Sequence, residues 1–362
     1  MSRRPLRFGL IGCGRVGHYH ASALAKLDDA ELATVCDVVP ERADEYVRLY
    51  GGEAVYDYRR VLDRSDVDVV CIATPSGGHP AIGIDAAHAG KHVVVEKPAG
   101  LTLTEIDALI GACDDAGVKL CVVHQNRFNA PVRRLRKALE EGRFGKLSHA
   151  TVAVRWNRNQ DYYEQAKWRG TWLEDGGVLM NQSIHAVDLL RWMMGEPESL
   201  GAFTATQFRS IAAEDVGVAA IRFRSGALGV IEASSNVYPS NWEETLTIFG
   251  EHGSVSIGGV AVNRVERWKF SDRSNGQNLM DEPDPASVYG SGHGPLLEAM
   301  INAIRTGGDP PVTGQDGRDA VELVLAVYRS QETGSMIRFP LAEESERIAR
   351  ARGMAPAGGC PR

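Results

Sequence analysis

The chain of 362 residues contains no hydrophobic run long enough to cross a membrane and no excess of basic residues. A membrane-spanning helix needs about 20 consecutive, mainly apolar residues. The formal net charge is −7, and this mild acidity argues against a surface that binds nucleic acid or anionic lipid. We therefore expect neither nucleic acid nor a membrane as a partner.

The six cysteines lack the paired spacing that is typical of metal sites and disulfide frameworks; they are Cys13, Cys36, Cys71, Cys113, Cys121 and Cys360. Most lie in or beside expected central strands, so we expect buried, reduced thiols. Ser2-Arg3-Arg4 loosely resembles the start of an export signal, but the apolar segment behind it soon breaks into glycines. We therefore expect a cytoplasmic protein.

With 43% hydrophobic and 24% charged residues, the chain is long enough for two domains with substantial cores. Up to about residue 123, apolar strand candidates alternate with helical segments. Val67 to Ile72 is a continuous β-branched run of the kind that is covered on both faces of a sheet. This pattern predicts an α/β domain with a parallel, doubly wound sheet over residues 1–123. Strands are expected near 6–11, 31–36, 54–56, 67–73, 92–95 and 119–123.

After Pro131 the pattern changes to a helix followed by alternating strands joined at tight turns such as Ser225-Gly226 and His252-Gly253. It predicts an α+β domain with an open, mainly antiparallel sheet over residues 124–340, and a tail over 341–362, mobile from Met354. Helices 295–305 and 315–332 are expected to return toward the first domain. Exposed apolar positions such as Val218, Ala220 and Ile221 predict a homodimer or homotetramer formed through the open sheet face.

The segment Gly12-Cys13-Gly14-Arg15-Val16-Gly17 fits the pattern G-x-G-x-x-G between the first strand and the first helix. In that setting the first glycine permits the tight turn, the second lets the backbone approach a pyrophosphate, and the third allows helix and strand to pack closely. The phosphates then rest on the helix N-terminus. Because a second strand ends at Asp37, twenty residues past Gly17, the sequence predicts a dinucleotide site.

Asp37 also indicates which dinucleotide the protein binds. A carboxylate accepts hydrogen bonds from both ribose hydroxyls of NAD but repels a 2′-phosphate by about 1 to 4 kcal/mol at contact distance. Arg42 is the nearest cation that would offset this repulsion. The expected cofactor is NAD; the alternative interpretation of Asp37 is a cap for the helix that starts at Pro40.

Glu96-Lys97-Pro98 follows the fifth strand and so stands at the carboxyl edge of the sheet, where doubly wound folds bind their ligands. A lysine beside a nicotinamide acts as an acid or base or polarises a carbonyl. The alternative is a solvated lysine in a loop. The glycine pattern at residues 12–17 and the acid at Asp37 favour the catalytic interpretation.

A second group of polar residues follows the glycines at Gly176-Gly177. Asn181, His185 and Asp188 fall at i, i+4 and i+7, on one face of an expected helix. This line predicts that an amide binds a sugar hydroxyl, an imidazole takes its proton, and a carboxylate orients the imidazole. The alternatives are a core histidine or a metal site, but no third ligand is evident, and we expect no metal.

These motifs resemble the glucose-fructose oxidoreductase, inositol dehydrogenase and rhizopine-catabolism oxidoreductase family, from about residue 6 to 340. The resemblance implies a Rossmann domain, a catalytic Lys97, and His185 as the group that exchanges the hydroxyl proton. It further implies a set of cofactor-binding residues: Gly12, Cys13, Gly14, Arg15, Val16, Asp37, Thr74, Pro75, His79, Glu96, Lys97, Gln125, Trp168 and Arg169. Asn181 departs from the inositol-type members, which usually carry Asp at that position.

Within this family, the segments 155–163, 168–172 and 180–182 look most like dehydrogenases that oxidise the 3-hydroxyl of UDP-N-acetylglucosamine or its glucuronic acid form. Arginines suit a diphosphate or carboxylate, and aromatic rings suit sugar faces and uracil. The expected substrate-binding residues are Lys97, Arg127, Tyr163, Asn181, Gln182 and His185. The alternatives are an inositol or free-sugar dehydrogenase, a non-catalytic NAD-binding regulator and an NAD-dependent glycosidase.

Overall fold

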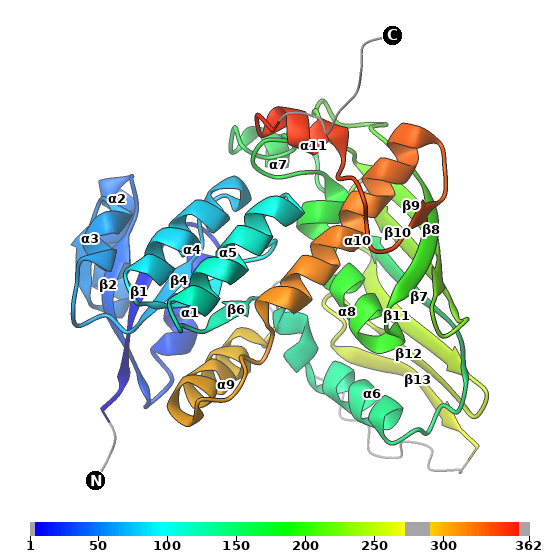
Figure 1. Ribbon diagram of the computed structural model, residues 1–362, viewed down its shortest axis with the longest axis horizontal. Coiled ribbons are helices and arrows are strands. Elements are labelled where there is room, and N and C mark those ends of the chain that lie inside the picture. Colours follow the sequence, from blue (N-terminus) through cyan, green and yellow to red (C-terminus); the bar gives the residue numbers. More distant parts are fainter. Residues whose placement is uncertain (1–3, 272–289, 355–362) are drawn as a thin grey trace. The chain divides into compact units, whose positions relative to one another are not determined.

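A computed structural model describes residues 4–271 and 290–354 of the protein (Figure 1). The chain divides into two compact units, which are described separately. Unit 1 comprises Met1–His124 with Gly292–Arg318, and unit 2 comprises Gln125–Ser291 with Asp319–Arg362. The expected division put residues 124–340 into one domain, whereas the segment Gly292–Arg318 groups with the first unit.

Unit 1 contains a six-stranded sheet in the order β3-β2-β1-β4-β5-β6, and every pair of neighbours is parallel. The predicted parallel, doubly wound sheet is therefore confirmed. The strand order reverses between β1 and β4, which is where such sheets open a crevice at their carboxyl edge. The strands are β1 (Leu6–Ile11), β2 (Ala30–Cys36), β3 (Glu53–Val55), β4 (Val69–Ile72), β5 (His92–Val95) and β6 (Leu120–Val122).

Helices of unit 1 lie between these strands. α4 packs against α5, and α1 packs against α9. All four residues of β4 are fully buried, as the continuous apolar run predicts. Thr102 caps α5 by accepting a hydrogen bond from the Glu105 backbone, and its hydroxyl donates to the Glu105 carboxylate. The helices are α1 (Gly17–Leu24), α2 (Pro40–Tyr50), α3 (Tyr58–Leu62), η1 (Ser76–Gly78), α4 (His79–His88), α5 (Leu103–Asp115) and α9 (His293–Thr306).

Unit 2 contains an eight-stranded sheet in the order β13-β12-β11-β7-β10-β9-β8-β14. Its pairs are antiparallel except β7 with β10, which is parallel. The mainly antiparallel sheet is confirmed, and the parallel pair fits the long connection between β7 and the later strands. The strands are β7 (Leu147–Arg155), β8 (Pro197–Ala205), β9 (Val216–Phe223), β10 (Leu228–Ser234), β11 (Glu243–Gly250), β12 (Gly253–Gly258), β13 (Arg264–Phe270) and β14 (Ile337–Arg338).

Helices cover one face of this sheet: α8 packs on β7 and β11, and α6 packs on β12. The long α10 begins in unit 1 and continues into unit 2. Its Ser330 and Gln331 side chains accept hydrogen bonds from the Ala202 and Thr204 backbones of β8, at 3.0 and 2.9 Å. The helices are η2 (Gln125–Phe128), α6 (Ala130–Glu140), α7 (Gln160–Glu164), η3 (Val178–Gln182), α8 (Ile184–Met194), α10 (Gly314–Thr333) and α11 (Glu346–Ala351). α11 lies within the segment that was expected to be a tail, and the residues of that tail beyond 354 are outside the described ranges.

The other face of the sheet exposes apolar side chains along β8, β9 and β10. Val218 and Val230 are both 45% exposed, Leu228 is 49% exposed and Phe203 is 76% exposed. The prediction for Ile221 was wrong, because this side chain is 3% exposed. Side chains alternate along a strand, so Ile221 faces the helices whereas Val218 faces outward.

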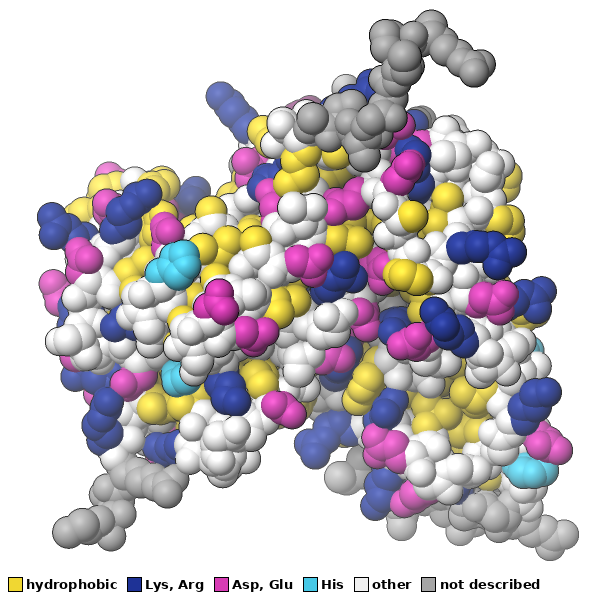
Figure 2. Space-filling view, in the orientation of Figure 1, with side chains coloured by type: hydrophobic (Ala, Val, Ile, Leu, Met, Phe, Trp, Pro, Cys, Tyr) yellow, Lys and Arg dark blue, Asp and Glu magenta, His cyan; other side chains and the backbone are white. Residues whose placement is uncertain are grey.

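The remaining composition-based expectations concern cysteines and charge. Five cysteines are buried and free in the described ranges, whereas Cys360 lies outside them. On the face shown in Figure 2, basic and acidic side chains are interspersed. No helix among the described residues is long and apolar enough to cross a membrane.

Candidate functional site

The glycine turn after β1 has the geometry of a dinucleotide cradle. Gly12 has a φ of +103°, and a Cβ there would meet the Ala73 carbonyl oxygen at 2.5 Å. A Cβ on Gly17 would lie 2.4 Å from the Gly12 carbonyl oxygen. Gly14 differs, since its Cβ would point into open space. Two glycines therefore allow close packing, and the third leaves room beside the backbone for a pyrophosphate.

Asp37 lies directly against this turn. Its carboxylate accepts hydrogen bonds from the Cys13 and Val39 backbones, both at 2.9 Å. The side chain is half-buried, so a ribose can still reach its remaining lone pairs. The glycine turn after β1 and the Asp37 carboxylate together fit the adenosine half of NAD. Arg15 and Val16 complete the turn at the start of α1.

We expect NAD to bind at least about fivefold more tightly than NADP, and replacement of Asp37 by Ser to narrow this difference in affinity. The reason is electrostatic, since a carboxylate repels a 2′-phosphate by about 1 to 4 kcal/mol. Titration of both cofactors into both proteins measures the ratio. Equal affinities of the unmodified protein would contradict the assignment of Asp37.

The loops after β4 and β5 carry the other predicted residues of unit 1. Pro75 is exposed and Thr74 is half-buried. Lys97 is half-buried in the loop after β5, and its backbone donates to the Glu96 carboxylate at 3.3 Å. His79, 1% exposed, stands at the start of α4 between the Thr74 and Pro98 carbonyl oxygens, at 2.8 Å from each. His79 therefore lies between the two loops and donates a hydrogen bond to one of them.

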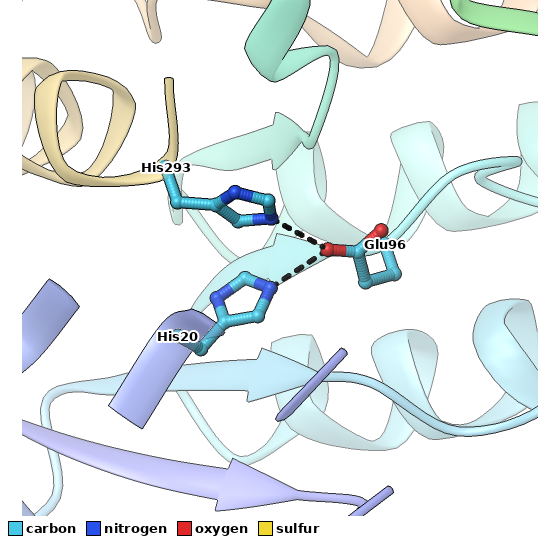
Figure 3. A group of neighbouring side chains, drawn as sticks. All are labelled: His20, Glu96 and His293. Atoms are coloured by element: carbon cyan, nitrogen blue, oxygen red, sulfur yellow. Dashed lines mark hydrogen bonds and ion pairs between the residues drawn. The ribbon is translucent and has the colours of Figure 1, made fainter. Parts of the chain in front are cut away.

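Glu96 points into a buried group of side chains instead of an open edge (Figure 3). The group is His20, Glu96 and His293, the one set of His, Cys, Asp or Glu side chains in the described ranges whose donor atoms converge as metal ligands would. A zinc ion holds its ligand atoms at about 2.0–2.2 Å, which separates them by roughly 3.3 Å in a tetrahedral site. His20 Nε2 lies only 2.8 Å from Glu96 Oε1. This distance is that of a hydrogen-bonded ion pair.

His185 stands in the first turn of α8 and is 7% exposed. Its Nε2 lies 3.3 Å from the Gln125 side-chain nitrogen. This contact holds the ring in place, and which of the two nitrogens donates depends on the imidazole tautomer. Asp188, three residues on, accepts hydrogen bonds of 2.9 and 2.6 Å from Arg127, whose guanidinium lies over the Trp192 ring. The predicted ligand Arg127 is thus part of a buried ion pair.

The expected single helix through Asn181, His185 and Asp188 is interrupted. Residues Val178–Gln182 form a π-turn, closed by a 2.8 Å hydrogen bond from the Ser183 backbone to Val178, and α8 starts only at Ile184. A π-turn inserts an extra residue, so positions 181 and 185 lose the i, i+4 register of an α-helix. The prediction of one α-helical face was wrong at this point.

Asn181 donates a hydrogen bond from its side-chain amide to the Asp175 carboxylate, which also accepts from the Gly170 backbone at 2.6 Å. Asp175 is 1% exposed. A carboxylate at position 181 would therefore face a second buried carboxylate, and like charges in a buried site repel strongly. The amide suits this surrounding. It gives a local physical reason for the departure from the inositol-type pattern.

Sequence reasoning missed Glu214, which supports the π-turn. Its backbone carbonyl accepts from Val178 at 2.9 Å, and its Oε1 accepts from the Leu179 backbone at 3.0 Å and from the Tyr328 hydroxyl at 2.9 Å. Burial raises the pKa of Glu214 to about 7. No sequence signal marks this residue, because the loop before β9 reads as an ordinary polar turn.

Glu214 predicts a pH-dependent stability. Its pKa is about 7 in the folded protein, compared with 4.5 for a free glutamate side chain. The folded state thus binds this proton more tightly, and stability falls as pH rises from 4.5 to about 7. The loss is on the order of 3 kcal/mol. Glu214→Gln is expected to remove most of this fall in urea unfolding measured from acid to mildly alkaline pH. An unchanged slope in the variant would assign the pH dependence to other groups.

The remaining predicted residues of unit 2 lie around the half-buried Tyr162. The Gln182 amide donates to the Tyr162 hydroxyl at 3.1 Å, and the Arg169 guanidinium lies 4.1 Å above the Tyr162 ring. Arg169 also lies over the Trp168 ring at 5.6 Å. Tyr163 is 5% exposed and hydrogen-bonded to Ser235, and burial raises the pKa of Tyr163 to about 12. Such a phenol is a poor proton acceptor near neutral pH.

Comparison with known proteins identifies the family to which the chain belongs. Residues 6–124 match the oxidoreductase family with an NAD-binding Rossmann fold, and residues 132–256 match the GFO/IDH/MocA C-terminal domain. The crystal structure of the WlbA dehydrogenase from Bordetella pertussis, in complex with NADH and UDP-GlcNAcA, is 43% identical with a TM-score of 0.87. The match covers 94% of this chain and 99% of that one.

Two further relatives are a second UDP-GlcNAcA complex and an inositol dehydrogenase. The WlbA dehydrogenase from Chromobacterium violaceum, also in complex with NADH and UDP-GlcNAcA, is 40% identical with a TM-score of 0.85, over 94% of this chain and 98% of that one. The myo-inositol 2-dehydrogenase of Thermotoga maritima is 29% identical over 92% of this chain and 98% of its own length. The glycine cradle, Asp37 and these matches agree on NAD as the cofactor. The chain belongs to the GFO/IDH/MocA family of NAD-dependent oxidoreductases.

Proposed function

We propose that the protein oxidises the 3-hydroxyl of UDP-GlcNAcA, the uronic acid form of UDP-N-acetylglucosamine, with NAD as the acceptor. The observation that carries this proposal is the 43% identity, over nearly the full length of both chains, to a dehydrogenase bound to NADH and UDP-GlcNAcA. Inositol and levoglucosan dehydrogenases are more distant relatives, at 26–29% identity. Oxidation of an inositol or a free sugar is therefore the second candidate.

The residues of unit 1 serve the cofactor in this proposal. The glycine turn receives the pyrophosphate, Asp37 receives the ribose, and NAD, when bound, supplies the acceptor for the hydride from the carbinol carbon. Lys97 orients the hydroxyl and stabilises negative charge on its oxygen as the proton leaves. Its half-buried position at the carboxyl edge of the sheet supports this role.

The residues of unit 2 serve the sugar. His185 takes the hydroxyl proton, and the Gln125 side chain, 3.3 Å from its Nε2, holds the imidazole in place. Gln182, Tyr162 and Arg169 form a connected polar and aromatic group, whose guanidinium and rings suit a diphosphate, a uronic carboxylate or uracil. Tyr163 supports this group from within the core.

Substrate screening tests the proposal. We expect NADH formation with UDP-GlcNAcA and a much lower rate with inositols, hexoses and UDP-N-acetylglucosamine, which lacks the carboxylate. Product analysis separates the other classes, because a regulator produces no NADH and a glycosidase releases an aglycone without net NADH. Preference for a free cyclitol would replace the proposed substrate by the second candidate.

We further propose that the protein is a homo-oligomer formed through the outer face of β8, β9 and β10. Antiparallel pairing brings Phe203 beside Val218, and Val230 beside Ala220, on one surface. Burial of such a surface stabilises by about 25 cal/mol per Å², and an isolated chain would leave it in water. Val230→Lys is expected to shift the oligomer toward monomer in analytical ultracentrifugation. A monomeric unmodified protein at micromolar concentration would contradict this proposal.

A further inference from the structure

Three buried histidines hold the loop that carries Lys97. His20 lies in α1, His293 begins α9 and His79 begins α4, so they come from distant parts of the sequence and all belong to unit 1. Their exposed fractions are 0%, 4% and 1%. All three contact a neighbour of Lys97 in the loop after β5, on the side of Glu96 or on that of Pro98.

On the side of Glu96, two imidazoles converge on one carboxylate oxygen (Figure 3). His20 Nε2 lies 2.8 Å and His293 Nε2 lies 3.5 Å from Glu96 Oε1. The His293 ring stacks on Tyr19 at 5.5 Å and meets the His20 ring edge-on at 5.3 Å. Each ring is therefore fixed by a neighbour as well as by the carboxylate.

Charge strengthens the pair of His20 and Glu96. Burial opposes charge on His20, but its interactions with Cys71 and Glu96 outweigh the effect of burial and raise the pKa of His20 to about 10. Burial likewise opposes charge on Glu96, whereas its hydrogen bond to His20 and its interaction with His293 hold the pKa of Glu96 well below its usual value. Both groups are thus ionised at neutral pH. Loss of either one leaves a buried charge uncompensated, which is strongly destabilising locally.

On the side of Pro98, His79 spans two loops. Its Nδ1 faces the Pro98 carbonyl oxygen and its Nε2 faces the Thr74 carbonyl oxygen, both at 2.8 Å. Burial lowers the pKa of His79, and a neutral imidazole carries one N–H, so the ring donates to one of these two carbonyl oxygens, on the opposite side of Lys97 from Glu96. Lys97 itself is half-buried, whereas its two neighbours in sequence are buried.

We propose that His20, His79 and His293 are positioning residues that fix Lys97 for catalysis, an inference that rests on the proposed role of Lys97. They act through Glu96 and Pro98, which determine the backbone path at Lys97. A displacement of about 1 Å at a reacting group costs on the order of 10² in rate. The three histidines contact Glu96 and Pro98 within the core of unit 1, so we expect their effect to pass through the loop.

The experiment compares His20→Asn with His20→Gln. The glutamine side chain is long enough to place an amide nitrogen near the position of the imidazole Nε2 and donate to Glu96, whereas asparagine is too short. We expect His20→Asn to lower single-turnover hydride transfer by about 10- to 100-fold, within the cost of such a displacement, and His20→Gln to restore most of it. NAD affinity should change by less than about threefold, since the glycine cradle and Asp37 are untouched. His88→Asn, at the exposed C-terminal end of α4, is the matched control.

A double-mutant cycle with Lys97→Met separates positioning from general damage. If His20 acts through Lys97, His20→Asn changes hydride transfer by less than about twofold once Lys97 is absent. The same fold-loss in both backgrounds would overturn the inference, as would a full rate in the His20→Asn single variant. If His20→Asn does not fold, His293→Asn and His293→Gln provide the same test. The His293 contact to Glu96 is longer, at 3.5 Å, so its loss should destabilise the fold less.

Two controls keep this test distinct from others. The first is the Lys97→Met variant alone. If it retains normal hydride transfer, the proposed function of Lys97 is wrong. If it is impaired but the histidine variants are not, the inference about the histidines is wrong.

Metal analysis of the purified holoenzyme provides the second control. We expect no stoichiometric zinc and no effect of a chelator on rate; stoichiometric zinc at this group would overturn the positioning role in favour of a metal site.

Discussion

Replacement of Lys97 by Met is expected to lower hydride transfer by at least about 10²-fold while the protein folds and binds NAD normally. The size follows from the usual contribution of a positioned acid or base to rate. The pyrophosphate and ribose contacts lie in the glycine turn and at Asp37, on other strands, so dinucleotide binding should survive. Cofactor titration beside single-turnover kinetics measures both effects.

The matched control for this variant is Lys137→Met in α6, whose side chain is 75% exposed. It removes the same charge from a surface position and keeps an unbranched stem of similar length, so it should leave the rate unchanged. Near-normal hydride transfer in Lys97→Met would remove the lysine from the mechanism.

Replacement of His185 by Ala is expected to lower the maximal rate by roughly 10²- to 10⁴-fold, the usual effect of losing a general base. Tyr163 cannot take over easily, since burial raises the pKa of its phenol to about 12. The pH profile of the residual rate should lose the limb that His185 supplies. His252→Ala, in the turn between β11 and β12 with a half-exposed side chain, is the control. A variant that keeps its rate across pH would make His185 a structural residue of α8.

The sequence predicted the features that depend on local chemistry. The roles of Gly12, Gly14 and Gly17 follow from where a Cβ fits, and each glycine in the structure has the space that the motif requires. Uninterrupted apolar runs predicted the parallel sheet, and turn residues predicted the hairpins of unit 2. Ile221 was misplaced because two positions of opposite parity were assigned to one face of the strand.

Other features depend on contacts between segments that are distant in sequence, which a single sequence does not reveal. Glu96 was expected to line the cofactor, yet its carboxylate pairs with His20 and lies 3.5 Å from His293. The π-turn before α8 depends on Glu214, which lies beyond the end of β8. One extra residue in that turn changes which side chains share a face, and hydrophobic periodicity does not resolve a shift of that size.

The proposed hydride transfer from UDP-GlcNAcA to NAD is tested most directly by a single-turnover measurement of NADH absorbance. Enzyme, NAD and UDP-GlcNAcA are mixed at comparable concentrations, so that bound and released NADH are both detected. We predict about one equivalent of NADH per active site with UDP-GlcNAcA, formed much faster than any NADH from myo-inositol. NADH formed from myo-inositol, and none from UDP-GlcNAcA, would contradict the proposed function.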